Sequence, residues 1–232
     1  MMKRRFTLWI SLLLNALLLL CLWVAVQRLG GWNYALSRLR HDEAGLYKSR
    51  KQLFEQMPVQ TGAVVLLGDS QTEQCEWQEW LQLDSVTVLN RGIVGDYTAG
   101  VLARLDEIVR HKPSKIFLLV GVNDLIFKKK PEDIALIYKE IVATIRSKTP
   151  NSELFLQSVL PVNNTLKKIG VENETIRQLN TEIAQIAKDN ALPYIDLYSE
   201  LTDTAGNLSP GYTEDGIHLN ARGYLVWKKR IF

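Results

Sequence analysis

The sequence has little cysteine and little histidine, which limits the chemistry it can support. Its two cysteines are Cys21 and Cys75, and Cys21 lies in an apolar run that Cys75 is not expected to reach, so we expect no disulfide framework. The three histidines, His41, His111 and His218, are far apart and have no cysteine at zinc-ligand spacing. We therefore predict no metal site.

The sequence also lacks an excess of charge of either sign. Lysine and arginine number 28 and aspartate and glutamate number 25, which gives a formal net charge of +3. We expect no nucleic-acid partner for so balanced a chain, because such binding depends on neutralising many phosphates. Hydrophobic residues make up 47% of the 232 positions, which is enough for one main core and a small appendage.

A long apolar run lies near the N-terminus. It extends from Phe6 to Val26 without a charge, and as a helix it would be roughly 31 Å long, enough to cross a membrane. The basic residues at positions 3–5 precede it, so the positive-inside rule places the N-terminus in the cytoplasm and the rest of the chain outside. We therefore predict a membrane anchor in residues 1–27 and an extracytoplasmic location for the remainder. A cleaved signal peptide is the alternative.

Residues 28–57 carry scattered apolar residues among many charges, an irregular helical pattern. The apolar positions are Leu36, Leu39, Leu46, Leu53 and Phe54. The pattern predicts a helical stalk or linker, which either packs on the globular domain or mediates self-association. Pro58 and Gly62 mark the start of the main domain, residues 58–232, and the oligomeric state stays open.

Short apolar runs and longer segments of helical period alternate from Val64 onward. Strands are expected at 63–68, 86–90, 115–121, 154–160 and 192–197, and helices at 99–111, 131–148 and 174–190. Strands that are apolar on both faces and separated by helices are typical of a parallel sheet covered on both sides. The sequence therefore predicts an α/β fold whose ligand site lies beyond the carboxyl ends of the strands.

Chemically complementary residues follow these strands. Ser70 comes directly after the first, in "GDS", and Gly95 follows the second in "NRGIVGD", where a glycine lets the backbone bend close to a ligand. Asn123 follows the third in "GVND", and "DGIH" near the C-terminus places Asp215 three residues before His218. A serine needs a base to become nucleophilic, and an imidazole oriented by a carboxylate supplies one.

These four blocks, in this order, resemble the SGNH, or GDSL-like, hydrolase family, and the resemblance covers residues 62 to 228. The stretch "LNRGIVGDYTAGVLARLDEIV" is similar to a branch that includes platelet-activating-factor acetylhydrolase subunits and bacterial sialate O-acetylesterases. The resemblance implies a flavodoxin-like α/β/α fold with a five-stranded parallel sheet, and ester hydrolysis through an acyl-serine. Its substrate would be a small acyl ester, with acetyl groups on a carbohydrate implied by the branch alone.

The roles that follow assign Ser70 as nucleophile, His218 as general base and Asp215 as its orienting carboxylate. The oxyanion of the tetrahedral intermediate would be held by the amides of Ser70 and Gly95 and the side chain of Asn123. We expect no cofactor. Gln71, after the serine, departs from the small or aliphatic residue that many members have there.

Other readings stay open at this level. The same residues would serve an acyltransferase to a glycan hydroxyl, and a glycan-binding module that keeps the fold without turnover is the non-enzymatic alternative. Asp69 and Asp124 are interpreted as structural acceptors, and His41 and His111 as surface residues. The lysine run 128–130 is interpreted as a solvated loop, with contact to an anionic lipid or substrate as the alternative. Acyl chain length is not predictable.

Overall fold

The computed structural model describes residues 2–28 and 43–232. The chain divides into two compact units, Met1–Gly45 and Leu46–Phe232. The larger unit holds every predicted site residue, and each unit is described by itself. Residues 29–42, with part of the predicted stalk and His41, lie outside the described residues.

The N-terminal unit contains helix α1, Met2–Arg28, which confirms the helical part of the prediction. Ser11 and Asn15 lie within its apolar run, and the Asn15 Nδ2 donates a hydrogen bond to the Ser11 carbonyl at 2.7 Å. Within the described residues, none of the helices has both the length and the apolarity that a membrane crossing requires, so the predicted anchor in residues 1–27 is not supported. The extracytoplasmic location depends on that span and stays a prediction.

The larger unit is built on a five-stranded sheet in the order β2-β1-β3-β4-β5, with every neighbouring pair parallel. Its strands are β1 Val64–Gly68, β2 Val88–Gly92, β3 Lys115–Leu119, β4 Glu153–Gln157 and β5 Tyr194–Ile195. All five lie within the runs predicted as strands or overlap them. In the register of the sheet, Gly68 lies opposite Gly92 and Leu119, so these three strands end at one edge.

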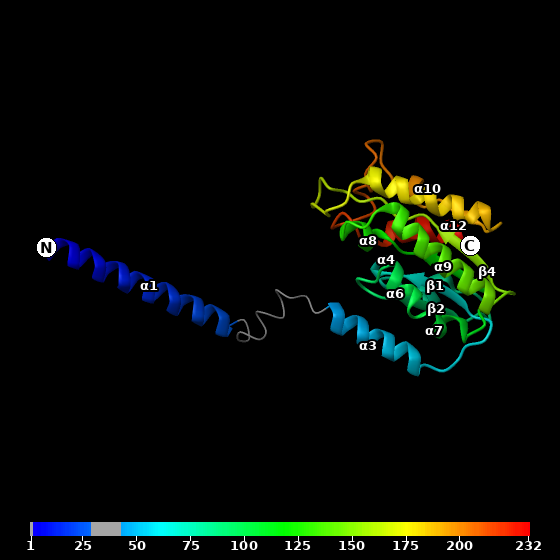
Figure 1. The fold of residues 1–232 in the computed structure, drawn as a ribbon, viewed down its shortest axis with the longest axis horizontal. Helices are drawn as coiled ribbons and strands as arrows, with labels where there is room; N and C mark the ends of the chain where they lie inside the picture. The colour runs from blue at the N-terminus through cyan, green and yellow to red at the C-terminus, as the bar shows by residue number, and fades with distance from the viewer. Residues whose placement is uncertain (1, 29–42) are drawn as a thin grey trace. The chain divides into compact units, whose positions relative to one another are not determined.

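Helices cover both faces of this sheet (Figure 1). After α1, the helices of the described residues are α3 Glu43–Gln56, α4 Ser70–Glu73, α5 Trp77–Leu81, α6 Thr98–Leu102, α7 Leu105–Val109, α8 Val122–Ile126, α9 Pro131–Lys148, α10 Asn173–Asp189, α11 Tyr198–Leu201 and α12 Ala221–Ile231.

Alternate residues of β1 enter two separate cores, as the two-residue period of a strand dictates. Val65 and Leu67 pack with residues of α9 and α10, whereas Val64 and Leu66 pack with Trp77 of α5 and with residues of α12. The result is the three-layer α/β/α arrangement of flavodoxin-like order that the sequence predicted.

The helix predicted at 99–111 is two helices, α6 and α7, separated at Ala103 and Arg104. The reason lies in the Arg104 side chain, which is buried and donates to the Gly68 and Arg91 carbonyls at 3.0 and 2.9 Å. A straight helix is interrupted here so that this guanidinium reaches the ends of β1 and β2.

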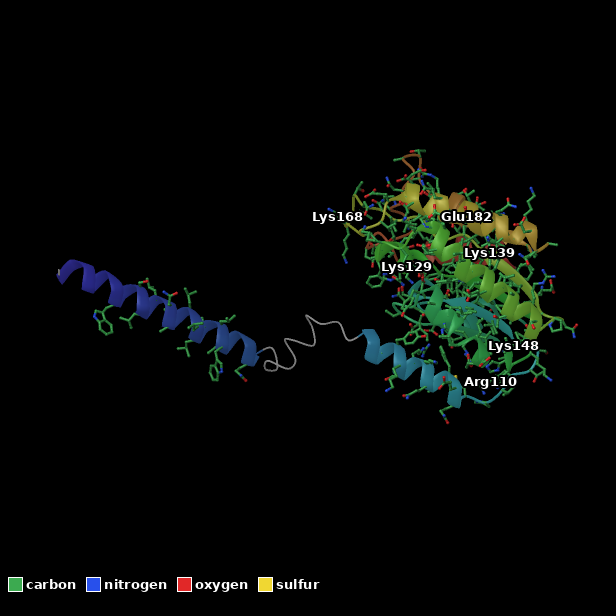
Figure 2. All side chains as sticks on the ribbon, in the orientation of Figure 1. Arg110, Lys129, Lys139, Lys148, Lys168 and Glu182 are labelled. Carbon is green, nitrogen blue, oxygen red and sulfur yellow. The ribbon has the colours of Figure 1, made fainter. Side chains whose placement is uncertain are left out.

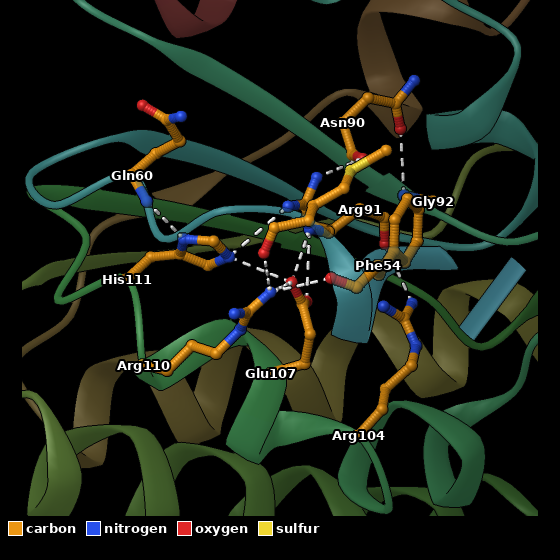
Figure 3. A network of polar contacts seen from close by, with 10 residues as sticks. Phe54, Gln60, Asn90, Arg91, Gly92, Arg104, Glu107, Arg110 and His111 are labelled. Carbon is orange, nitrogen blue, oxygen red and sulfur yellow. Dashed lines mark hydrogen bonds and ion pairs between the residues drawn. The ribbon is translucent and has the colours of Figure 1, made fainter. Parts of the chain in front are cut away.

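The second half of α3 packs on the domain (Figure 3). Phe54 is buried, and the guanidinium of Arg91 lies over its ring at 4.6 Å. Arg110 Nη2 donates to the carbonyls of Phe54 and Met57 at 2.7 and 2.9 Å, which satisfies acceptors at the end of the helix. The compact unit extends from Leu46 to Phe232 and so includes this half of α3.

His111 is fully buried, so its interpretation as a surface residue is wrong. Its Nδ1 accepts a hydrogen bond from the Gln60 amide at 2.9 Å, and its Nε2 lies 2.9 Å from Glu107 Oε1 (Figure 3). Because Nδ1 accepts, the ring proton is on Nε2 and is donated to the carboxylate. This histidine joins α7 to the chain that enters β1.

We predict that Phe54→Ala lowers the free energy of unfolding by about 3 to 5 kcal/mol, because it empties a buried site and removes the ring beneath Arg91. Leu53→Ala is the matched control, since Leu53 is 47% exposed and its loss should cost less than about 1 kcal/mol. Urea denaturation of both variants measures the difference. Equal effects at the two positions would show that the helix is not held through Phe54.

Candidate active site

The serine that follows β1 is held by a tight turn. A Cβ at Gly68 would lie 2.1 Å from the Leu119 carbonyl oxygen and 2.3 Å from Thr72 Oγ1, so only glycine fits at the strand end. Asp69 then caps the short helix α4, its Oδ1 accepting from the Gln71 amide at 3.0 Å. Ser70 is thereby fixed as the first residue of α4, at the carboxyl edge of the sheet.

The structure brings Ser70, His218 and Asp215 into one hydrogen-bonded chain. Ser70 Oγ lies 3.0 Å from His218 Nε2, and His218 Nδ1 lies 2.7 Å from Asp215 Oδ2. A carboxylate only accepts, so the ring proton belongs on Nδ1 and Nε2 is left to accept the serine proton. This is the arrangement that a serine nucleophile and its base require.

Asp215 is held as a carboxylate by its own turn. Its Oδ1 accepts the backbone amides of Ile217 and His218 at 3.0 and 2.8 Å. Partial burial raises the pKa of Asp215, but these amides and the His218 ring outweigh it and lower the pKa to about 2. The group that orients the imidazole therefore stays ionised at any pH at which the protein works.

The loop after β2 and the start of α8 bring the predicted oxyanion residues to the same edge. Gly95 has φ +74°, in the left-handed region where glycine is favoured. The Asn123 Nδ2 donates to the carbonyl of Asp96 at 2.8 Å, and the other hydrogen of that amide remains to be directed at a substrate oxygen. Asn123 is thus oriented by the residue that follows Gly95.

Two aspartates lock this loop in place. Asp96 is fully buried and its Oδ2 accepts from Arg104 Nε at 2.9 Å. Asp124 accepts the Thr98 amide at 2.8 Å and the Thr98 hydroxyl at 2.9 Å, so it acts as the structural acceptor that was predicted. Asp96 and Arg104 were not singled out from the sequence. The only signal was their place in the motif that carries Gly95.

The structural role of Gln71 was also not predicted from the sequence. Its side-chain Nε2 donates to the Ile217 carbonyl at 3.0 Å, and its own carbonyl accepts the Tyr224 hydroxyl at 2.7 Å. The residue after the serine therefore joins the nucleophile helix to the turn that carries His218. No local sequence pattern predicts this hydrogen bond, because Gln71 and Ile217 are 146 positions apart.

Asp69 and Cys75 lie near the serine without reaching the hydrogen-bonded chain. Burial raises the pKa of Asp69 to about 7, and the nearby Asp96 and Asp124 add to that effect. Burial also raises the pKa of the Cys75 thiol to about 12, so this packed thiol stays protonated and unreactive near neutral pH.

The raised pKa of Asp69 predicts a pH-dependent stability. The folded chain keeps a proton that the unfolded chain releases near pH 4, so this group makes stability fall as pH rises from about 4 to 7. Asp69→Asn keeps an acceptor for Gln71 and removes the titration. Relative to wild type, the variant should gain up to about 4 kcal/mol between pH 4 and pH 8, measured by urea denaturation. A difference that is constant with pH would contradict the prediction.

Comparison with known proteins agrees with this geometry. The model of the GDSL-like Lipase/Acylhydrolase family matches residues 66–226, a span that contains all the site residues described above. Among curated proteins, an N-acylneuraminate cytidylyltransferase from Escherichia coli is 29% identical over 155 residues. That match covers 65% of this chain and 35% of the relative, so the chain spans about a third of the relative's length.

Solved structures show the same fold. A protein from Streptococcus pneumonia described as a platelet activating factor aligns with a TM-score of 0.73 and 28% identity, over 87% of this chain and 98% of its own. A GDSL-like lipase from Bacteroides thetaiotaomicron aligns with a TM-score of 0.67 and 22% identity, over 80% and 94%. Because the family model spans well over half of its residues, this chain belongs to the GDSL-like lipase/acylhydrolase family.

Proposed function

We propose that the protein is a serine esterase that hydrolyses small acyl esters, with acetyl esters of a carbohydrate as the preferred class. The observation that carries the proposal is the hydrogen-bonded chain from Ser70 through His218 to Asp215, set at the carboxyl edge of the sheet. A module that only bound glycans would have no use for a nucleophile, a base and an ionised orienting group in contact. This favours turnover over binding.

In the acylation half of the proposed reaction, Ser70 Oγ attacks the ester carbon while its proton passes to His218 Nε2. A bond forms between Oγ and carbon, and the carbonyl oxygen becomes an oxyanion. The Ser70 and Gly95 amides and the Asn123 side chain are the donors proposed to hold it. The alcohol then leaves with the proton from His218, and an acyl-Ser70 ester remains.

Deacylation repeats these steps with water in place of serine. His218 takes a proton from the water, whose oxygen attacks the acyl carbon, and the second tetrahedral intermediate collapses as Ser70 regains its proton. In the transferase alternative, a sugar hydroxyl takes the place of water. Both routes use the same residues, and Asp215 stabilises the imidazolium in each.

Two of the comparisons bear on the substrate class. One relative is named for a sugar acid, N-acylneuraminate, although only about a third of its length matches this chain. The structure described as a platelet activating factor supports the branch to which the sequence motif was assigned. Together they favour a short acyl group on the hydroxyl of a carbohydrate or of a phospholipid. We prefer the carbohydrate because the first of these relatives is named for a sugar acid.

The direct test compares hydrolysis of p-nitrophenyl acetate and of longer-chain esters by the wild-type chain and by Ser70→Ala. We expect acetate release to fall by at least about 10³-fold in Ser70→Ala, because the acyl-enzyme cannot form. Cys75→Ala is the matched control, since its thiol is buried and protonated and its loss should leave the rate unchanged.

Three results would count against the proposal. Activity that survives in Ser70→Ala would exclude the serine route, and folded wild-type protein without turnover on any ester would favour the binding module. Release that depends on an added sugar acceptor, with the acyl group recovered on that sugar, would identify a transferase.

A second prediction concerns the orienting carboxylate. In Asp215→Asn the amide oxygen is needed by the backbone N–H groups of Ile217 and His218, so its NH₂ faces the imidazole. The ring would then carry its proton on Nε2 and be unable to accept one from Ser70. We expect kcat for the acetyl ester to fall about 10² to 10⁴-fold. Glu214→Gln, on the neighbouring residue, should retain full activity.

A further inference from the structure

Two loops beside the candidate site expose large apolar side chains. Phe127 directly follows α8 and is 66% exposed. Leu166, in the loop after β4, is 48% exposed. Each is followed directly by lysines, in the sequences "FKKK" at 127–130 and "TLKK" at 165–168. We call these eight residues the basic rim.

Hydrogen bonds tie the basic rim to the catalytic residues. The Phe127 amide donates to the Asn123 carbonyl at 2.9 Å. The Thr165 amide and hydroxyl donate to Asn163 Oδ1 at 3.0 and 2.6 Å, and the Asn163 amide donates to the Gly216 carbonyl, next to Asp215, at 2.7 Å. Lys128 Nζ donates to the Gly170 carbonyl, so the two loops lie side by side. Both loops of the basic rim are therefore linked to segments of the candidate site, one to Asn123 and the other to the turn that carries Asp215.

The charge of the rim is of one sign. It contains five lysines and no acid, and Figure 2 shows Lys129 and Lys168 at the same end of the domain. Lys129 pairs with Asp124, but Lys130, Lys167 and Lys168 form no ion pair with any residue in the described part of the chain. This local excess stands out in a protein whose overall charges nearly cancel.

We infer that the basic rim docks on an anionic lipid surface and holds the active site against it. Lysines near such a surface each contribute about 1 kcal/mol of attraction, and exposed apolar side chains bury themselves at the boundary between headgroups and acyl chains. A soluble polyanion would satisfy the lysines but leave Phe127 and Leu166 in water. The pairing of apolar tips with unpaired cations is what selects lipid.

This inference goes beyond the proposed esterase function, because docking needs no turnover. It adds that the ester reaches Ser70 from a membrane, as part of a lipid or glycolipid, since the loops that touch the surface also carry Asn123 and contact the turn of Asp215. Binding is therefore measured in the full chain carrying Ser70→Ala, in which hydrolysis does not contribute.

The test reads the local environment of the rim, which separates docking there from binding by any other part of the chain. An environment-sensitive dye is attached at Phe127→Cys or Leu166→Cys in a Cys21→Ser background, where Cys75 is buried. Val59→Cys is the matched control, because Val59 is 51% exposed and precedes β1 at the opposite edge of the sheet. Vesicles contain phosphatidylcholine alone or with phosphatidylglycerol.

We expect the emission of the dye at positions 127 and 166 to shift to the blue with vesicles that contain phosphatidylglycerol, and not with vesicles of phosphatidylcholine alone. The dye at position 59 should show no shift with either kind of vesicle. Salt at about 1 M should reverse the blue shift, because screening shortens the reach of surface charges to about 3 Å. The variant Lys130→Gln/Lys167→Gln/Lys168→Gln should weaken vesicle affinity about 100-fold. The control variant Lys112→Gln/Lys139→Gln/Lys229→Gln, with exposed lysines outside the rim, should not.

The inference is overturned if protein sediments with phosphatidylglycerol vesicles while the dyes at 127 and 166 stay in water. It is also overturned by equal dye shifts on neutral and anionic vesicles, because the lysines would then not contribute to binding. A response to a soluble anionic polysaccharide but not to vesicles would assign the rim to a glycan instead. Loss of ester hydrolysis by the wild type would leave the docking result unaffected.

Discussion

The guanidinium of Arg104 joins the parts of the chain on which the candidate site is built. It lies buried beneath the sheet edge, donates to the carbonyls at the ends of β1 and β2, and forms an ion pair with Asp96 at 2.9 Å. Ser70 follows the first of these strands and Gly95 the second, and the Asp96 carbonyl holds Asn123. Removing one member of a buried ion pair costs about 3 to 5 kcal/mol. The same contact therefore sets the relative positions of the nucleophile and the proposed oxyanion donors.

The fold was largely predictable because its determinants are local. Buried parallel strands are nearly continuous apolar runs, and all five were recognised, as were α9 and α10. Two expectations failed, for the single helix at 99–111 and for His111 at the surface, and the sequence left open where α3 packs; in each case a side chain has a distant partner. Arg104 breaks the predicted helix to reach a carbonyl 36 positions away, Phe54 brings α3 into the domain under Arg91, and His111 is buried against Gln60 and Glu107. The periodicity of hydrophobic residues along the sequence gives no information on contacts between distant side chains.

The residues of the candidate site were likewise predictable only in part. Ser70 and Asn123 were predictable because parallel strands end at one edge, so residues that follow them converge whatever the distance along the chain. His218 lies well beyond the end of β5, and it was assigned from the resemblance of its "DGIH" block to the family. Gln71 was noticed only as an unusual neighbour of the serine. Its bond to Ile217 has meaning once the turn of Asp215 lies against α4, and that proximity follows from packing of α12 and not from any motif. The positions of Ser70 and Asn123 follow from the topology of the sheet, whereas those of Gln71 and of the turn that carries His218 follow from packing.

The acids around the serine show how packing also sets charge. Asp124 has Lys129 and Asp215 has two amides and an imidazole, so each of these carboxylates has donors for its charge. Asp96 has Arg104, although burial still raises the pKa of Asp96. Asp69 has one amide, and its second oxygen is buried without a partner, which is why its pKa rises to about 7. A fully ionised Asp69 next to Ser70 would oppose the negative charge that develops on a tetrahedral intermediate. By leaving this one acid short of donors, the fold reduces that opposition while keeping the capping bond that positions the serine.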